Sequence, residues 1–292
     1  MVEVLSAGHV NWDVTLRVDR LPVPDGEASI HSQRGAGGGS AGNVAAALAS
    51  LGVASGIVGS VGDDEYGMLA RRELEREGVD CAGLREVEGD TSTKYLLVDD
   101  DGEVAVLGND GVNEAVGPED VDPDRVEAAN HLHLTSQRPE TAARLASVAD
   151  EAALTISVDP GRRLPERDFS SAIDRADVIF LNDREAEAAL EAEYPASDFA
   201  DRVVVIKHGG EGAEVHTPEA TYSHPGFDVP VTDTTGAGDA FAAGFVAVLR
   251  EGGGYERALE FANACGALAA RTEGAKTSPS RNEVERFLAG QF

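Results

Sequence analysis

The segment DTTGAGDAF, which begins at Asp233, holds the residues best suited to chemistry. Two threonines and two glycines lead into an apolar run that is typical of a helix, so the N–H groups of residues 236–239 are expected to converge at its start. Such a cluster binds a phosphate or stabilises its transition state. Asp239 lies in the same turn, where a carboxylate can accept the proton of an attacking hydroxyl. An isolated Gly-x-Gly-Asp would be an ordinary helix cap, but the flanking residues favour phosphoryl transfer.

Three other glycine-containing motifs do not fit this sequence. Gly37-x-Gly39-x-x-Gly42 matches a dinucleotide fingerprint, but that motif needs a buried strand before it, and HSQRGA is polar. Gly38-x-Ser40-x-Gly42 matches a nucleophile elbow and fails the same test. A Walker A loop needs a Gly-Lys pair, which the chain lacks. An oxidoreductase is therefore disfavoured, and phosphate chemistry must depend on the Asp233 segment.

The charge balance limits the partners. The 292 residues include 53 Asp and Glu but only 24 Lys and Arg, and the net charge is −29. Such a surface repels nucleic acid and anionic membranes. The acids are spread along the whole chain, which indicates a surface suited to molar salt and a halophilic source, although an ordinary acidic enzyme is the alternative. Two distant cysteines and a start without a basic stretch favour the cytoplasm.

Two sequence patterns indicate the elements that position these residues. Residues 15–34 and 93–107 alternate polar and apolar around turns, which predicts two half-exposed hairpins. Elsewhere helices and strands alternate, so we expect a parallel sheet with helices on its faces. Helices are predicted at 40–51, 63–77, 139–152, through 194, 238–250, 255–271 and 280–289. His131-x-His133 lacks a third ligand nearby in the sequence, which favours packing over a metal site.

Two motifs resemble the signatures of the ribokinase-like (PfkB) carbohydrate kinases. DTTGAGDAFAAGF is similar to the C-terminal signature and GAGGGSAGNVAAALASLG to the N-terminal one, about 200 residues apart as in that family. The resemblance implies one domain over residues 1–292, a three-layer α/β/α sandwich whose two hairpins form a small β-sheet lid. It also implies transfer of the γ-phosphoryl group of ATP to a sugar hydroxyl, with Mg²⁺ and K⁺, and a homodimer through the lid.

The resemblance also implies roles for single residues. It makes Asp239 the general base beside an anion hole of Gly236, Ala237 and Gly238. It assigns the acceptor to Asn11, Asp13, Gly38, Gly39 and Asn43. It assigns the nucleotide to Asn182, Lys207, Gly209, Gly212, Thr235 and Asn263. It places Glu185 in the Mg²⁺ network, and it places Asp233 and the backbone of residues 272–278 beside a monovalent cation. Asn11 and Asp13, two apart on a strand, face the same side and are expected to clamp the sugar together.

The chain departs from ribokinases at two positions. Ser40 stands where they have a lysine, and residues 135–138, TSQR, stand where they have an acidic substrate contact. An anionic acceptor would bind an arginine fork, for which Arg34, Arg138, Arg162 and Arg163 are candidates, and we expect Arg138 to contribute to it. Alternatively, these arginines are surface residues that pair with the abundant acids. The acceptor therefore stays open between a neutral sugar, ribose 1-phosphate, fructose 1-phosphate, 2-keto-3-deoxygluconate and a nucleoside. A non-catalytic relative is disfavoured because Asp239 and its glycines are intact.

Overall fold

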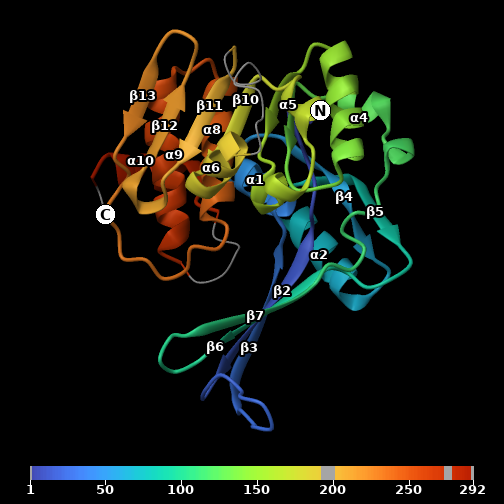
Figure 1. Cartoon of the computed structure of the whole chain (residues 1–292), viewed down its shortest axis with the longest axis vertical. Helices are drawn as coiled ribbons and strands as arrows, with labels where there is room; N and C mark the ends of the chain where they lie inside the picture. The colour runs from blue at the N-terminus through green and yellow to red at the C-terminus, as the bar shows by residue number, and fades with distance from the viewer. Residues whose placement is uncertain (1, 192–200, 273–277, 291–292) are drawn as a thin grey trace.

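The computed structural model describes residues 2–191, 201–272 and 278–290. It contains a nine-stranded sheet covered by helices on both faces and a separate four-stranded sheet that projects from one end of this sandwich (Figure 1). The predicted α/β/α sandwich with a small β-sheet lid is confirmed.

The central sheet has the strand order β13-β12-β11-β10-β9-β8-β1-β4-β5, and its strands are parallel from β11 to β5. The parallel strands are β1 (Val4–Ala7), β4 (Ser55–Gly62), β5 (Asp80–Val87), β8 (His131–Leu134), β9 (Thr155–Val158), β10 (Val178–Asn182) and β11 (Val203–Lys207). Two short strands, β12 (Ala213–His216) and β13 (Thr221–His224), add an antiparallel edge. The sequence pattern did not predict β5, β12 or β13, because strands at or next to the edge of a sheet lack the continuous apolar run of central ones.

Alternate residues of each central strand enter two different cores. On β1, for example, Val4 packs with one set of helices and Leu5 with the other. The first face carries α1 (Ser40–Ser50), α2 (Glu65–Arg76), α8 (Ala237–Arg250), α9 (Tyr255–Ala270) and α10 (Arg281–Leu288). The second carries α3 (Pro123–Glu127), α4 (Pro139–Glu151), α5 (Ser170–Ile173) and α6 (Asp183–Glu191).

The predicted helices agree with these bounds to within two residues, apart from residues 192–194, which lie outside the described part of the chain. Three short 3₁₀ turns complete the list: η1 (Pro118–Asp120), η2 (Gly161–Glu166) and η3 (Gly209–Glu211). Within the described residues, every helix is too short or too polar to cross a membrane.

The lid consists of the two predicted hairpins placed side by side. Strands β2 (Asn11–Val18) and β3 (Ile30–Gly38) form one, and β6 (Thr93–Val98) and β7 (Val104–Asn109) form the other. The hairpins join through parallel pairing of β2 with β6. The polar run before Gly37 belongs to strand β3, which is exposed over most of its length. It is therefore not the buried strand that a dinucleotide fingerprint requires.

His131 and His133 pack inside the central sheet. Both lie on β8 and hydrogen-bond to the Ser157 hydroxyl on β9, at 2.7 and 2.8 Å. Burial lowers the pKa of each histidine to about 3, so both rings are neutral at neutral pH. This polar cluster lies among otherwise apolar strands.

Candidate active site

A cavity of about 260 Å³ lies where the carboxyl ends of the central strands meet the base of the lid. Ser136 follows β8, Asp159 follows β9 and Lys207 ends β11, and all three line the cavity. Ligands of open α/β sheets bind at this edge of the sheet. The lid contributes Asn11 from β2 and Lys94 from β6 to the same wall.

Asp239 lies on this wall, in the first turn of α8. Its Oδ2 accepts a hydrogen bond of 2.7 Å from the side-chain amide of Asn43, a buried residue of α1. Burial raises the pKa of Asp239 to about 6, although the bond from Asn43 and the charge of Lys207 oppose that rise. The carboxyl group is therefore ionised at neutral pH and more basic than an exposed aspartate, as a general base requires.

The backbone before α8 differs from the expected anion hole at one residue. Gly236 caps the helix in the left-handed region, with φ of 77°, which a glycine adopts at little cost. The Ala237 N–H donates to the Thr234 carbonyl at 3.2 Å, so it is already engaged. The N–H groups of Gly236, Gly238 and Asp239 have no hydrogen-bond acceptor within the described ranges. These three donors, rather than Ala237, can bind an anion.

Asp233 stabilises the same loop through two hydrogen bonds. Its Oδ1 accepts the Thr235 N–H at 2.9 Å, and its own N–H donates to the Ala270 carbonyl at 3.2 Å. The monovalent-cation site expected beside Asp233 includes residues 273–277, which lie outside the described part of the chain.

The opposite wall of the cavity combines a lysine with two acids. The Lys207 ammonium donates to Asp159 Oδ2 at 2.6 Å. Glu185 is buried and exchanges hydrogen bonds of 3.0 Å with Asn182, each side chain accepting the other residue's N–H. Burial, reinforced by the charge of Asp159, raises the pKa of Glu185. The structure therefore brings three residues assigned to the nucleotide and Mg²⁺, namely Asn182, Glu185 and Lys207, close to one another.

The expected pair on β2 separates into two pockets. Asn11 lines the cavity and accepts a 2.7 Å bond from the Asn113 side chain, whereas Asp13 lines a smaller pocket that includes Asp233 and Thr235. In this structure the two side chains therefore line different pockets, and the shared acceptor site stays a prediction. Asp13 Oδ1 is buried without a hydrogen-bond partner, and burial raises the pKa of Asp13 to about 6.

The remaining expected residues lie at different distances from the cavity. Gly39 lines it, while Gly38 and Asn43 line a small adjoining pocket. Of the six residues assigned to the nucleotide, only Lys207 is part of its wall, and the other five are not: Asn182, Thr235, Gly209, Gly212 and Asn263. The two glycines belong to the turn between β11 and β12, and the Asn263 side chain donates to the Leu259 carbonyl within α9.

Arg138, which was expected to bind an anionic acceptor, lies outside the cavity. It directly precedes α4 with an exposed side chain and is not part of the cavity wall. Arg162 and Arg163, two residues of η2, line the cavity instead. The extended backbone of Arg138 ends the preceding loop, and the sequence gives no sign of which way such a residue points.

Several cavity residues were not identified from the sequence. They are His9, Ser92, Lys94, Asp110, Asn113 and Asp159. Asp159 carried a usable signal, because an acid at the carboxyl end of a parallel strand faces the ligand edge of the sheet. The others lie on loops and lid strands that only the tertiary fold brings together.

Comparisons with known proteins agree with this geometry. The model of the pfkB family carbohydrate kinases matches residues 1–282. The chain is 65% identical over 295 residues to the ATP-dependent ribose-1-phosphate kinase of Halopiger xanaduensis, and the match covers 100% of both chains. It is 29% identical to the ribokinase of Bacillus subtilis, over 99% of this chain and 100% of the relative.

Solved structures give the same fold. The ribokinase of Thermotoga maritima superposes with a TM-score of 0.88 at 26% identity, covering 99% of this chain and 100% of the other. The Arabidopsis thaliana ribokinase complexed with ribose and ATP gives 0.86 at 24% identity, with 99% of each chain covered. The sandwich with its lid is therefore a known fold.

Proposed function

Because the chain belongs to the PfkB family of carbohydrate kinases, we propose that it transfers the γ-phosphoryl group of ATP to a hydroxyl of ribose 1-phosphate. The carbohydrate-kinase class follows from the family, and the relative at 65% identity suggests the donor and the acceptor. The observation that carries the proposal is Asp239, a carboxyl group of raised pKa that faces the cavity at the start of a helix.

In the proposed reaction the acceptor hydroxyl attacks the γ-phosphorus of ATP. A new oxygen–phosphorus bond forms, the bond from the γ-phosphorus to the bridging oxygen breaks, and ADP leaves. Asp239 takes the hydroxyl proton, and Asn43 holds the carboxylate in place through the 2.7 Å bond. The N–H groups of Gly236, Gly238 and Asp239, at the positive end of α8, stabilise the charge on the transferred group.

The opposite wall suits the triphosphate. Lys207 can donate to phosphate oxygens, and its bond to Asp159 aims the ammonium into the cavity. Asp159 and Glu185 offer the hard oxygen ligands that Mg²⁺ prefers, directly or through water. When bound, Mg²⁺ neutralises phosphate charge. We assign Thr235, together with Gly209, Gly212 and Asn263, to the rest of the nucleotide by the family resemblance.

We also propose that K⁺ binds beside Asp233 and tightens the loop that leads into α8. Support comes from the position of Asp233, whose carboxylate holds the Thr235 N–H two residues before the anion-binding amides. KCl should then activate more than NaCl at equal ionic strength. Equal activation by both salts in a steady-state assay would argue against a site for K⁺.

The lid is proposed to close over the acceptor, with Asn11 and Asp13 binding sugar hydroxyls. A buried carboxylate oxygen without a partner is unfavourable, so a hydroxyl donated to Asp13 Oδ1 would stabilise the closed form. Closure also excludes water, which would otherwise compete as the phosphoryl acceptor.

We further propose a homodimer formed through the lid. Ile30, Val104, Val106 and Leu107 are exposed apolar side chains of the lid, from 55% to 61% accessible. A second copy of the lid would cover them. Light scattering at molar KCl should give twice the chain mass, and a monomeric mass at micromolar concentration would contradict the dimer.

We propose that the protein acts in the cytoplasm. Support comes from its two buried cysteines, which form no disulfide and suit a reducing compartment, and from the proposed use of ATP.

An ATP-coupled assay at molar KCl tests the proposed function. The acceptors are ribose 1-phosphate, ribose, fructose, fructose 1-phosphate, 2-keto-3-deoxygluconate and nucleosides. We expect the highest kcat/KM with ribose 1-phosphate and a sugar bisphosphate as product. A higher kcat/KM with ribose or a nucleoside would overturn the choice of acceptor while leaving the kinase class intact.

A further inference from the structure

We infer that Arg162 and Lys94 bind the phosphate group of the acceptor, one from the sandwich and one from the lid. This inference rests on the proposed function and adds the specificity-determining residues of the same site. It further gives Glu114 the role of a positioning residue, which holds Arg163 beside the phosphate.

The charge of the cavity differs from that of the chain. The chain has 24 Lys and Arg against 53 Asp and Glu. The cavity wall has four of each. Its basic residues are Lys94, Arg162, Arg163 and Lys207, and its acidic residues are Asp110, Asp159, Glu185 and Asp239. Cations are therefore concentrated here, as the recognition of an anionic ligand requires.

Two of the four cations have their charge satisfied by the protein. Lys207 is paired with Asp159 at 2.6 Å, and Arg163 with Asp110 and Glu114 at 2.9 and 3.1 Å. Arg162 and Lys94 have neither an ion-pair nor a hydrogen-bond partner among the residues that the structure describes. Two unpaired cations on one cavity wall match the double negative charge of a sugar phosphate.

Two short hydroxyl side chains also line this cavity, Ser40 and Ser136. Their small size leaves space for a phosphate group. A hydroxyl group is a suitable partner for a phosphate oxygen.

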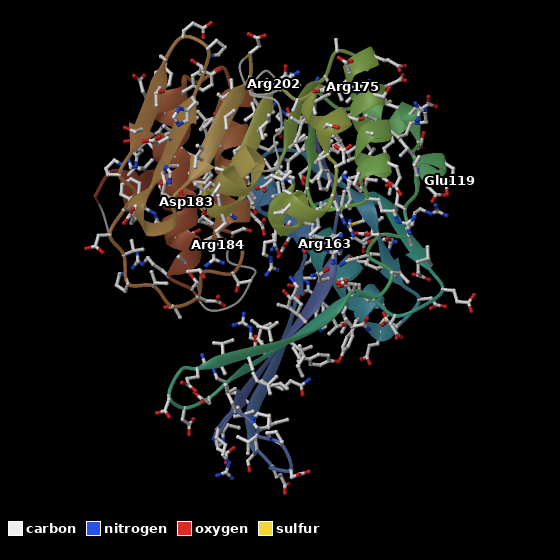
Figure 2. All side chains as sticks on the ribbon, in the orientation of Figure 1. Glu119, Arg163, Arg175, Asp183, Arg184 and Arg202 are labelled. Carbon is white, nitrogen blue, oxygen red and sulfur yellow. The ribbon has the colours of Figure 1, made fainter. Side chains whose placement is uncertain are left out.

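Glu114 organises the neighbouring side of the cavity. Its carboxylate accepts hydrogen bonds from Arg167 at 2.7 Å and from Arg163 at 3.1 Å, and His9 Nε2 lies 3.1 Å from it. The bond with His9, followed by those with Arg167, lowers the pKa of Glu114 to about 2, so it stays ionised. Figure 2 shows Arg163 near the point where the lid strands leave the sandwich. Its second partner, Asp110, is 80% exposed and can yield to a phosphate.

The two cations belong to different parts of the molecule. Arg162 lies on η2 of the sandwich, and Lys94 lies on β6 of the lid. A phosphate held by both would connect the two parts, so the acceptor's own charge would favour closure of the lid. A neutral sugar would lack this connection.

Steady-state kinetics of Arg162→Met test the inference. Loss of a charge-assisted contact should raise the KM for ribose 1-phosphate by about 10- to 100-fold. The kcat and the KM for ATP should stay within about twofold of wild type. Arg162→Lys should recover part of the loss. Arg138→Met is the matched control, because it removes the same charge from an exposed site outside the cavity. Lys94→Met should raise the same KM.

The possible outcomes separate the inference from the proposed function. If the wild-type enzyme does not phosphorylate ribose 1-phosphate, the proposed function fails. If it does and Arg162→Met leaves that KM unchanged, the inference fails and the function stands. Equal increases in Arg162→Met and Arg138→Met would indicate a general charge effect and overturn the inference. A thermal melt at molar KCl shows whether each variant is folded.

Discussion

The central sheet and the lid sheet of this kinase are built on opposite principles. In the central sheet both faces are covered by helices, and strands such as β8 and β10 are buried along almost their whole length. The lid strands project away from the sandwich (Figure 1). Of these strands, β3 is exposed from Ile30 to Arg34, and β7 is largely exposed. The central sheet is thus held by its own core, whereas much of the lid surface is exposed.

This difference suggests that phosphoryl transfer and acceptor recognition depend on different parts of the molecule. The groups that we propose to act on phosphoryl transfer, Asp239 and the amides before α8, rest on the apolar packing of α1 against α8. The groups that we propose to recognise the acceptor lie on the lid strands and on η2 of the sandwich. We therefore expect changes at Asp239 and these amides to alter kcat, and changes at the acceptor-binding groups to alter the acceptor's KM.

The largest expected effect is that of Asp239→Asn on the sandwich side. Loss of the general base should lower kcat by at least ~100-fold, while ATP binding and the melting temperature stay near wild type. Single-turnover kinetics and calorimetric titration with ATP measure the two quantities. A variant that keeps more than about a third of wild-type turnover would remove Asp239 from the mechanism.

On the lid side, Asp13→Ala should act on the acceptor. Removal of a charged acceptor of a hydrogen bond, worth about 1.5–3 kcal/mol, should raise the KM for ribose 1-phosphate by about 10- to 100-fold. Thr15→Ala, in the same small pocket, is the control and should be nearly silent. An unchanged KM in the Asp13 variant would show that the lid does not bring this carboxyl group to the sugar.

The pH dependence of kcat/KM should reflect the burial of Asp239. The base must be ionised, and its pKa is about 6 in the folded protein, so activity should fall about tenfold per unit below pH 6. Asn43→Ala removes the hydrogen bond that lowers the pKa, so the acid limb should move to higher pH. An acid limb that stays in place in this variant would contradict the role of Asn43. Circular dichroism at each pH controls for unfolding.

The smallest expected effect concerns salt, and it separates the two sheets directly. A net charge of −29 destabilises the compact state when salt no longer screens it. Below a few tenths molar KCl, hydrogen exchange should speed up in β3 and β7 before it does in β8 and β10, because the lid has less buried apolar surface. Simultaneous loss of protection in all four strands would show that the two sheets unfold as one unit.

The sequence predicted those parts of the site that depend on local geometry. Asp239 and Gly236 were identifiable because one turn and the helix after it define their arrangement. Lys94, His9 and Asn113 were not, because lid pairing and loop packing bring them to the cavity from distant segments. The structure places Arg138 outside the cavity wall and the Ala237 N–H in a hydrogen bond with Thr234. Both placements depend on the direction of one bond, which residue type does not determine.

The two neutral histidines inside the central sheet give the protein an internal response to acid. An unfolded histidine binds a proton near pH 6.5, whereas His131 and His133 resist it down to about pH 3, so unfolding takes up two protons as the pH falls. Asp13 and Asp239 have the opposite sign, because their folded pKa values of about 6 exceed the unfolded value, so the folded form gains protons first. Between pH 6 and 4 the two pairs largely offset each other. Between about pH 4 and pH 3 the two carboxyl groups become protonated in the unfolded chain as well, so their opposition fades. The histidines, together with Glu114, whose folded pKa is about 2, then draw the chain toward unfolding.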